Sequence, residues 1–253
     1  GYTGGMNIGC KYLGAKKKKN PWRDTQVRIE GDAVYLLQYY FLYDWKYANG
    51  TKNEIGTESA DSSLFPAGEC TSELPCQVVG SGVDTDKQVL KLSYLRMISL
   101  AQRRIVLQTP YFIPSISLFD AIKVALSSGV EVVLMIPRDN TNFFLEPVTR
   151  YFVAQLIPLG LTVLQYDGYI HAKTLRVDDT ITCIGSVNID IRSLEVDDEI
   201  CAIFYSEAFA KRYDEVISED IGHSQELDYE AFLQRGLLSR FAERFFLLFS
   251  PLM

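Results

Sequence analysis

From residue 77 onward, short β-type segments alternate with longer amphipathic helical segments, and this alternation constrains the fold more than any other feature. We expect strands at 77–79, 104–108, 130–136, 161–166, 174–177, 182–184 and 199–204, and helices at 85–101, 115–127, 146–157 and 206–220. A helix between two strands is typical of parallel pairing, because it carries the chain back across the sheet. The sequence therefore predicts an α/β sandwich with a largely parallel mixed sheet flanked by helices.

Composition divides the chain into three parts. Residues 1–47 begin as loop and end in an apolar, aromatic stretch long enough for a helix, whereas 48–76 are rich in Gly, Ser, Thr, Asn and Glu, as in a linker. Residues 77–253 form the α/β body, and its end carries apolar residues on one helical face: Leu237, Leu238, Phe241, Phe245, Leu248 and Phe249. This predicts a C-terminal amphipathic helix, and two alternatives stay open, packing on the body or contact with a membrane surface.

Charge and cysteine content exclude several classes of protein. The chain has 25 Lys and Arg against 32 Asp and Glu, a net charge of −7, so it lacks the basic surface of a general nucleic-acid binder. No apolar run reaches the roughly 18 residues that a membrane-spanning helix needs. Five cysteines without a CxxC repeat indicate neither a disulfide framework nor a zinc cluster. We therefore expect no nucleic-acid partner, no metal and no cofactor.

The residues most specific for chemistry lie between 171 and 188, on two predicted strands joined by the turn 178–180. Alternate residues of a strand face the same side, so His171 and Lys173 are expected to point into one pocket. At the end of the second strand, the Ser186 hydroxyl and the Asn188 amide are placed to donate to a phosphate oxygen. Phosphoryl transfer without a metal needs such a set of imidazole, ammonium, hydroxyl and amide groups. The pattern HxKx4Dx6GSxN, which includes Asp178, therefore predicts a phosphodiester site.

This pattern resembles the HKD motif of the phospholipase D superfamily. The surrounding sequence is similar to the bacterial cardiolipin synthase family in four stretches, at 108–114, 169–174, 185–193 and 247–252. The resemblance covers nearly the whole chain and implies a phospholipase D-like sandwich.

The opening residues resemble the end of that family's first HKD motif. Gly5 and Asn7 stand where Ser186 and Asn188 stand in the second motif, and the similarity continues through 21–25. The His, Lys and Asp of a first motif would precede residue 1, as would the family's membrane-spanning segments, and the chain has no initiator Met. We therefore interpret 1–47 as the remnant of a first phospholipase D-like half, 48–76 as a linker and 77–253 as a complete second half.

The resemblance implies a two-step transfer through a phosphohistidine. One His attacks phosphorus, while the other protonates the leaving alkoxide and then deprotonates the incoming alcohol. By resemblance, the first-motif His is the nucleophile and His171 is the general acid and base. Lys173, Ser186 and Asn188 would bind phosphoryl oxygens.

Three carboxylates receive supporting roles from the same resemblance. Glu199, on the strand after the motif, is expected to hold the second ring nitrogen of His171. Asp24 is expected to serve the first-motif His in the same way. Asp178 belongs to the motif, but it faces the turn and is expected to act mainly as a structural anchor.

The implied function is a phosphatidyltransferase that joins two phosphatidylglycerols and releases glycerol. The alternatives are a phospholipase D-type hydrolase or nuclease, which would use water as the acceptor, and a fragment that is inactive when isolated. The implied partners are phosphatidylglycerol, a membrane surface, and either the missing N-terminal half or a second copy that completes the site. The implied location is the cell membrane, with the catalytic part facing the cytoplasm.

Overall fold

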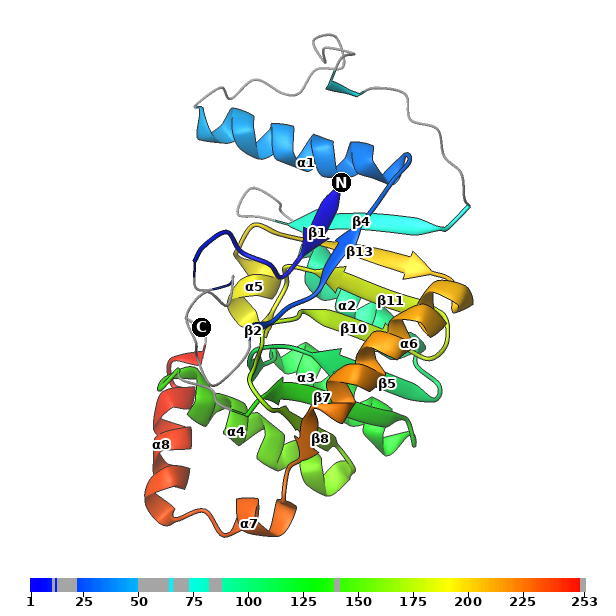
Figure 1. Ribbon diagram of the computed structural model, residues 1–253. Helices are drawn as coiled ribbons and strands as arrows, with labels where there is room; N and C mark the ends of the chain where they lie inside the picture. Colours follow the sequence, from blue (N-terminus) through cyan, green and yellow to red (C-terminus); the bar gives the residue numbers. More distant parts are fainter. Residues whose placement is uncertain are drawn as a thin grey trace.

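The computed structural model describes residues 1–10, 12, 22–49, 64–65, 73–81, 88–138 and 142–250 (Figure 1). The strands are β1 (Tyr2–Gly4), β2 (Trp22–Arg23), β3 (Gln26–Arg28), β4 (Cys76–Ser81), β5 (Arg104–Gln108), β6 (Phe112–Ile113), β7 (Glu131–Pro137), β8 (Thr162–Tyr166), β9 (Tyr169–Ile170), β10 (Thr174–Val177), β11 (Ile181–Gly185), β12 (Ile189–Asp190), β13 (Glu199–Tyr205) and β14 (Ser224–Glu226). The helices are α1 (Ala33–Ala48), α2 (Val89–Leu100), α3 (Ile116–Ser127), α4 (Leu145–Leu156), the 3-10 turn η2 (Ile157–Leu159), α5 (Ile191–Glu195), α6 (Glu207–Gly222), α7 (Tyr229–Leu233) and α8 (Leu237–Leu247). Each long strand and helix expected from the alternating pattern is present, with ends shifted by a few residues.

The central sheet has the strand order β14-β8-β7-β5-β10-β11-β13-β4. It is mixed, as expected, but the expectation that it is largely parallel is wrong. Only the β5–β7 and β7–β8 pairs are parallel, and they are the pairs linked by α3 and by α4 with η2. The tight turn after β10 makes β10 and β11 a hairpin, and β13 and β4 extend the sheet in antiparallel fashion. In the central sheet, the parallel pairs are therefore the two whose strands are connected by a helix.

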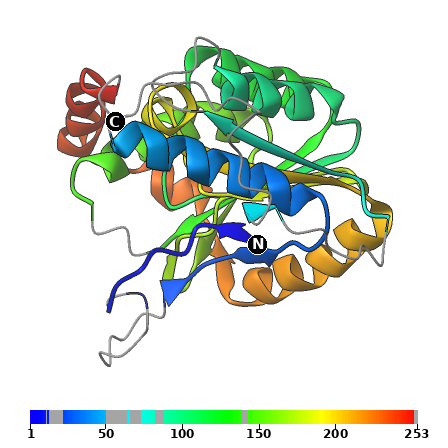
Figure 2. The same ribbon diagram turned by 90° about the horizontal axis from the view of Figure 1, so that it is seen from above.

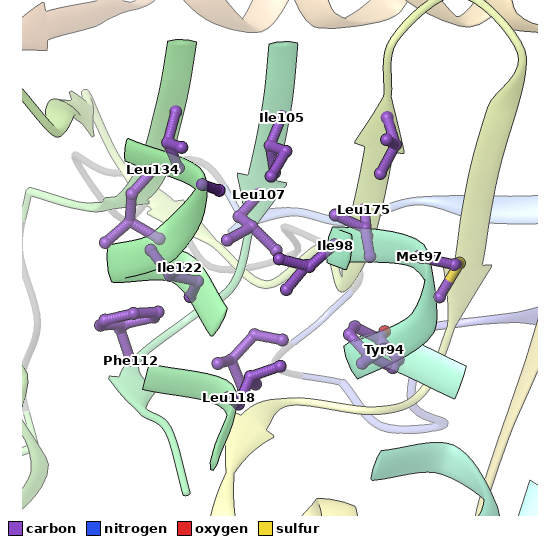
Figure 3. Packing of buried hydrophobic residues seen from close by; sticks show 14 of the residues in the cluster. Tyr94, Met97, Ile98, Ile105, Leu107, Phe112, Leu118, Ile122, Leu134 and Leu175 are labelled. Atoms are coloured by element: carbon purple, nitrogen blue, oxygen red, sulfur yellow. The ribbon is translucent and has the colours of Figure 1, made fainter. Parts of the chain in front are cut away.

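Helices cover both faces of this sheet, because apolar side chains alternate along the central strands. Ile105 and Leu107 of β5 face the layer formed by α2, α3 and α4, whereas Val106 between them packs with Tyr213 and Ile217 of α6. Figure 2 shows the orange α6 and the green α2 and α3 on opposite sides of the sheet. Figure 3 shows the α2 and α3 side of the core, where the side chains of both helices meet those of β5, β7 and β10. The result is a three-layer sandwich that holds the motif on two central strands.

The N-terminal segment packs directly on this body. β1 and β3 pair with each other and contact β11, and Val27 and Ile29 join the core beneath α6. β2 pairs in parallel with β9, which places Trp22 opposite Tyr169 and Arg23 opposite Ile170. The predicted linker 48–76 lies mostly outside the described residues, so the division into halves stays a prediction.

The predicted C-terminal helix is present as α8 and packs on α4. Phe246 contacts Phe143 and Phe144, which lie just before α4, and Glu243 is buried in an ion pair with Arg235. Within the described part of the chain, no helix is long and apolar enough to cross a membrane.

A core substitution tests the packing of the sandwich. Leu107 is 0% exposed, whereas Leu92 on α2 is 57% exposed. We expect Leu107→Ala to lower the free energy of unfolding by about 2–5 kcal/mol, because it removes buried methyl groups and leaves a cavity. Leu92→Ala should change it by no more than about 0.5 kcal/mol. Urea unfolding of the two variants measures both values, and equal losses would contradict this core.

Candidate active site

The site forms where β9 ends and β10 begins. The backbone N–H of His171 donates to the Arg23 carbonyl at 2.6 Å, and the Gly185 N–H donates to the Lys173 carbonyl at 3.2 Å. These two bonds tie the motif to β2 on one side and to β11 on the other. The Lys173 ammonium lies 2.8 Å from His171 Nδ1 and donates to the His171 carbonyl at 2.6 Å. The two side chains therefore lie together, as predicted, although residues 171–173 connect β9 to β10 and are not part of a strand.

The acidic partner of His171 is Asp24. Asp24 Oδ2 lies 2.7 Å from His171 Nδ1, and Asp24 Oδ1 accepts from the Thr25 N–H at 2.8 Å. Both side chains are largely buried, 15% exposed for His171 and 4% for Asp24. A carboxylate can only accept, so the contact with Asp24 needs a proton on Nδ1, whereas a bond from the Lys173 ammonium would need Nδ1 unprotonated. Because Lys173 also donates to the His171 carbonyl, we infer the tautomer that has the proton on Nδ1 and leaves Nε2 as the basic nitrogen.

The expectation that Glu199 holds His171, and that Asp24 serves another His, is therefore wrong in this structure. The parallel β2–β9 pairing ends with Arg23 opposite Ile170, so Asp24, the next residue after β2, comes to lie beside the His171 imidazole. That pairing joins segments far apart in the chain, and strand periodicity cannot reveal it.

Glu199 instead lies at the start of β13, near Ser186 and Lys173. The pKa of Glu199 is raised to about 7, chiefly by burial. The nearby Asp190 and Asp197 carboxylates contribute to the rise, while a hydrogen bond with Ser186 and the charge of Lys173 oppose it. The Glu199 carboxyl group is therefore only partly ionised at neutral pH and can donate or accept a proton there.

The Lys173 side chain lies near the Asp24 and Glu199 carboxylates, and the residue is 4% exposed. Burial lowers its pKa to about 8, and the charges of Asp24, Glu199 and Asp190 limit the shift. The ammonium is therefore charged at neutral pH, and it could pair with a phosphate oxygen that displaces part of its present contacts.

Gly5 and Asn7, the expected remnant of a first motif, lie at different depths. Gly5 is buried, and a side chain there would collide with the Asp24 carboxylate and the His171 carbonyl and press on Lys173. The position needs Gly because the N-terminal backbone passes so close to the site. Asn7 is exposed and its amide donates to the Tyr12 hydroxyl at 3.4 Å, so it lies outside the cluster.

The proposed phosphate ligands Ser186 and Asn188 are both half-buried. The Ser186 hydroxyl accepts from the Ile200 N–H at 3.0 Å, so it is bound to β13. The Asn188 amide donates to the Tyr111 hydroxyl at 3.0 Å and to Ser193 at 3.1 Å. The Asn188 carbonyl oxygen is buried without a partner among the described residues. Contacts with a phosphate therefore stay a prediction for both residues.

Asp178 lies at the far end of β10 and does not join the cluster. It has φ +47°, and its carboxylate accepts from the backbone N–H groups of Gln102, Arg103 and Arg104 at 2.8–2.9 Å. Burial alone would raise the pKa of Asp178, but these three bonds outweigh it and the pKa is lowered. The geometry is that of an anchor between the β10–β11 turn and the start of β5.

Sequence reasoning missed an aromatic wall beside His171. The Trp22 ring lies 4.9 Å from the imidazole and stacks on Tyr169 at 4.6 Å, while Tyr12 meets Trp22 edge-on at 4.8 Å. Two of the stretches that resemble the family, 21–25 and 169–174, contain Trp22 and Tyr169. Their proximity in space, however, depends on the β2–β9 pairing.

Together, these groups suit chemistry on a phosphodiester. His171 has one nitrogen fixed by Asp24 and the other available as a nucleophile or a base, and Lys173 supplies positive charge beside it. Within the described ranges, no group of three or more His, Cys, Asp or Glu side chains could hold a metal ion.

Fold and site together define a domain of the phospholipase D class. The chain belongs to the family described as "Cardiolipin synthase, PLD-like domain", which matches residues 94–221. It is 39% identical over its whole length to the major cardiolipin synthase of Bacillus subtilis and to a cardiolipin synthase of Listeria monocytogenes, and covers 52% of each. The chain thus spans about half the length of these relatives.

Solved structures agree with this fold. The phospholipase D family member Nuc from Salmonella typhimurium has a TM-score of 0.52 at 17% identity, covering 61% of this chain and 99% of that one. Phosphatidylserine synthase from Haemophilus influenzae has a TM-score of 0.55 at 16% identity, covering 71% and 46%. The predicted phospholipase D-like sandwich is therefore confirmed.

The raised pKa of Glu199 predicts a pH-dependent effect on stability. Its pKa is about 7 in the folded protein against an ordinary value of 4.5, so the folded protein binds the proton more tightly and loses stability as pH rises through this range. Glu199→Gln removes the buried charge and should raise Tm at pH 8 by at least about 2–4 °C, with a smaller gain at pH 5. Thermal melts at both pH values measure this. The exposed Glu226→Gln serves as the control, and an equal gain for Glu199→Gln at both pH values would contradict the prediction.

Proposed function

We propose that this chain carries the second half-site of a phosphatidyltransferase that joins two phosphatidylglycerols to form cardiolipin and glycerol. The observation that carries the proposal is the His171–Asp24 pair beside the buried Lys173, in a chain 39% identical over its length to cardiolipin synthases. The Asp24 carboxylate fixes the imidazole, so that Nε2 is the nitrogen presented to the reaction.

In the proposed reaction, a nitrogen of the first-motif His attacks the phosphorus of one phosphatidylglycerol. A P–N bond forms, the P–O bond to glycerol breaks, and protonated His171 gives its Nε2 proton to the leaving alkoxide. His171 then removes the proton from a hydroxyl of the second phosphatidylglycerol, whose oxygen attacks phosphorus and breaks the P–N bond. Lys173 stabilises the charge that develops on the phosphoryl oxygens.

A second histidine must come from outside the described site, either from an N-terminal half of a longer protein or from a second copy. The position of Glu199 supports a second histidine. Glu199 lies beside Lys173 and Ser186, and Asp24 lies beside Gly5, the residue that corresponds to Ser186 in the first motif. We propose that Glu199 holds the first-motif His as Asp24 holds His171. Each half would then supply the carboxylate for the histidine of the other half.

Two other functions share this chemistry. A hydrolase or nuclease would use water in the second step, but the net charge of −7 disfavours a polyanionic substrate. The isolated chain would also be inactive if neither a first half nor a second copy completes the site.

Product analysis with phosphatidylglycerol vesicles tests the function. We expect a chain completed by a first-motif half to form cardiolipin and glycerol, and His171→Gln or Lys173→Gln to lower kcat/KM by about 10³-fold or more, because the groups act as a unit. Arg104→Gln, on the exposed start of β5, is the control. Phosphatidic acid without cardiolipin would favour the hydrolase, and full activity of His171→Gln would exclude the role of His171.

The membrane surface is the second proposed partner, and α8 is the element we assign to it. Its outward face exposes an apolar set: Leu237, Leu238, Phe241, Phe245, Leu248 and Phe249. Arg240 and Arg244 are also exposed on this helix, in a protein of net negative charge. Figure 1 places the red α8 on the same side of the molecule as β2 and α5, which border the site. An apolar face with flanking arginines suits the surface of a bilayer of anionic lipid.

The substrate is a membrane lipid, so we place the whole protein at the cell membrane. The cytoplasmic orientation of the catalytic part rests on the family resemblance alone.

Vesicle binding tests the role of α8. We expect Leu238→Ser with Phe241→Ser to weaken binding to phosphatidylglycerol vesicles at least about tenfold, because each residue loses roughly 1.5–3 kcal/mol of apolar transfer. Ile116→Ser, exposed on α3, should leave binding unchanged. Sedimentation with vesicles measures both. Equal binding by all three proteins would show that α8 does not contact the bilayer.

A further inference from the structure

A partly buried ion pair joins the site to α6, with the Arg23 side chain 22% exposed and that of Asp220 3% exposed. Asp220, 2% exposed and close to the end of α6, accepts from Arg23 Nε at 2.7 Å and from Arg23 Nη2 at 2.9 Å. The pair joins β2 to α6, and its two residues are 197 positions apart in the sequence. The same Asp220 oxygen that meets Nη2 also accepts from Gln108 Nε2 at 2.8 Å.

Stability alone does not account for this pair. Taking two charges out of water costs as much as their attraction returns, so apolar residues of similar volume serve as well or better. The position of Asp220 adds to the cost, because a negative charge near a helix C-terminus opposes the helix dipole. Where such a pair is kept, conformational specificity is the better-founded explanation.

The Arg23 guanidinium fixes the backbone that carries the histidine partner. Its Nη1 donates to the Thr25 hydroxyl at 3.1 Å and to the Asp24 carbonyl. The Arg23 carbonyl in turn accepts from the His171 N–H at 2.6 Å. The Arg23 side chain therefore fixes the two residues that follow it, and the first of them presents its carboxylate to His171.

The network also reaches the strand that carries Lys173. Gln108 Oε1 accepts from the Thr174 hydroxyl at 2.8 Å and from the Tyr213 hydroxyl at 3.0 Å. Thr174 directly follows Lys173, so Asp220 is linked through Gln108 to the start of β10. Both sides of the site therefore depend on one buried carboxylate.

We propose that Arg23 and Asp220 are positioning residues, which hold Asp24 against His171 Nδ1 and so keep Nε2 free for the reaction. The inference rests on the proposed role of His171. Lys173 Nζ lies 2.8 Å from the same Nδ1, and it would donate to Nδ1 once Asp24 withdrew. Loss of the Arg23–Asp220 pair should therefore move the proton of the neutral imidazole from Nδ1 to Nε2.

The tautomer can be measured directly, because the chain has only two histidines, His171 and His223. Nitrogen-15 NMR of histidine-labelled protein distinguishes an Nδ1–H from an Nε2–H imidazole, and His223→Gln assigns the two signals. We expect Nδ1–H for His171 in the unchanged chain. Asp24→Asn should abolish that signature and so calibrates the measurement.

The deciding variant is Arg23→Met with Asp220→Asn, which leaves no unpaired buried charge and keeps an acceptor for Gln108. We expect it to keep the circular dichroism of the fold and to lose the Nδ1–H signature. The matched control is Asp214→Asn, which breaks the two-bond pair of the same helix with the buried Arg176 and should keep the signature.

If the double variant does not fold, Arg23→Lys decides, because it keeps the charge opposite Asp220 but loses the Nη1 donations to Asp24 and Thr25. A folded variant that retains Nδ1–H at His171 overturns the proposal, as does equal loss of the signature in Asp214→Asn. The NMR experiment does not measure turnover, so its result holds even if the transferase assay fails. Conversely, an unchanged tautomer would leave the proposed reaction intact.

Discussion

The hydrogen bond between His171 and Asp24 is the interaction on which the site depends, and it joins residues 147 positions apart. It exists because β2 pairs with β9 just before the motif begins. Without that pairing the imidazole would have only the Lys173 ammonium beside Nδ1, and the other tautomer would be favoured. The N-terminal segment therefore contributes a residue to the candidate site as well as to the fold.

The electrostatics of the site follow from burying one cation between two carboxylates. Burial lowers the pKa of Lys173 to about 8 and raises that of Glu199 to about 7, so both groups titrate near neutral pH. Asp24 is already engaged by His171 and Thr25, whereas Glu199 has no imidazole beside it among the described residues. This asymmetry is consistent with the half-site that we propose.

The sandwich accounts for the rigidity of the arrangement. The motif strands β10 and β11 lie in the middle of the sheet, with helices on both faces, and Asp178 fixes their turn to β5 through three backbone bonds. Asp178 and His171 thus lie beyond opposite ends of β10, Asp178 at the β10–β11 turn and His171 in the candidate site. The apolar face of α8 that does not pack on α4 remains exposed.

The sequence by itself determined the elements and the residues of the motif, because both depend on local periodicity and spacing. The strand and helix pattern, the shared face of His171 and Lys173 and the anchoring role of Asp178 could all be predicted in this way. The proportion of parallel pairs, the partner of His171 and the Arg23–Asp220 pair could not. Each of these depends on which distant segments pair in space, and only the tertiary structure decided that Asp24, rather than Glu199, reaches the imidazole.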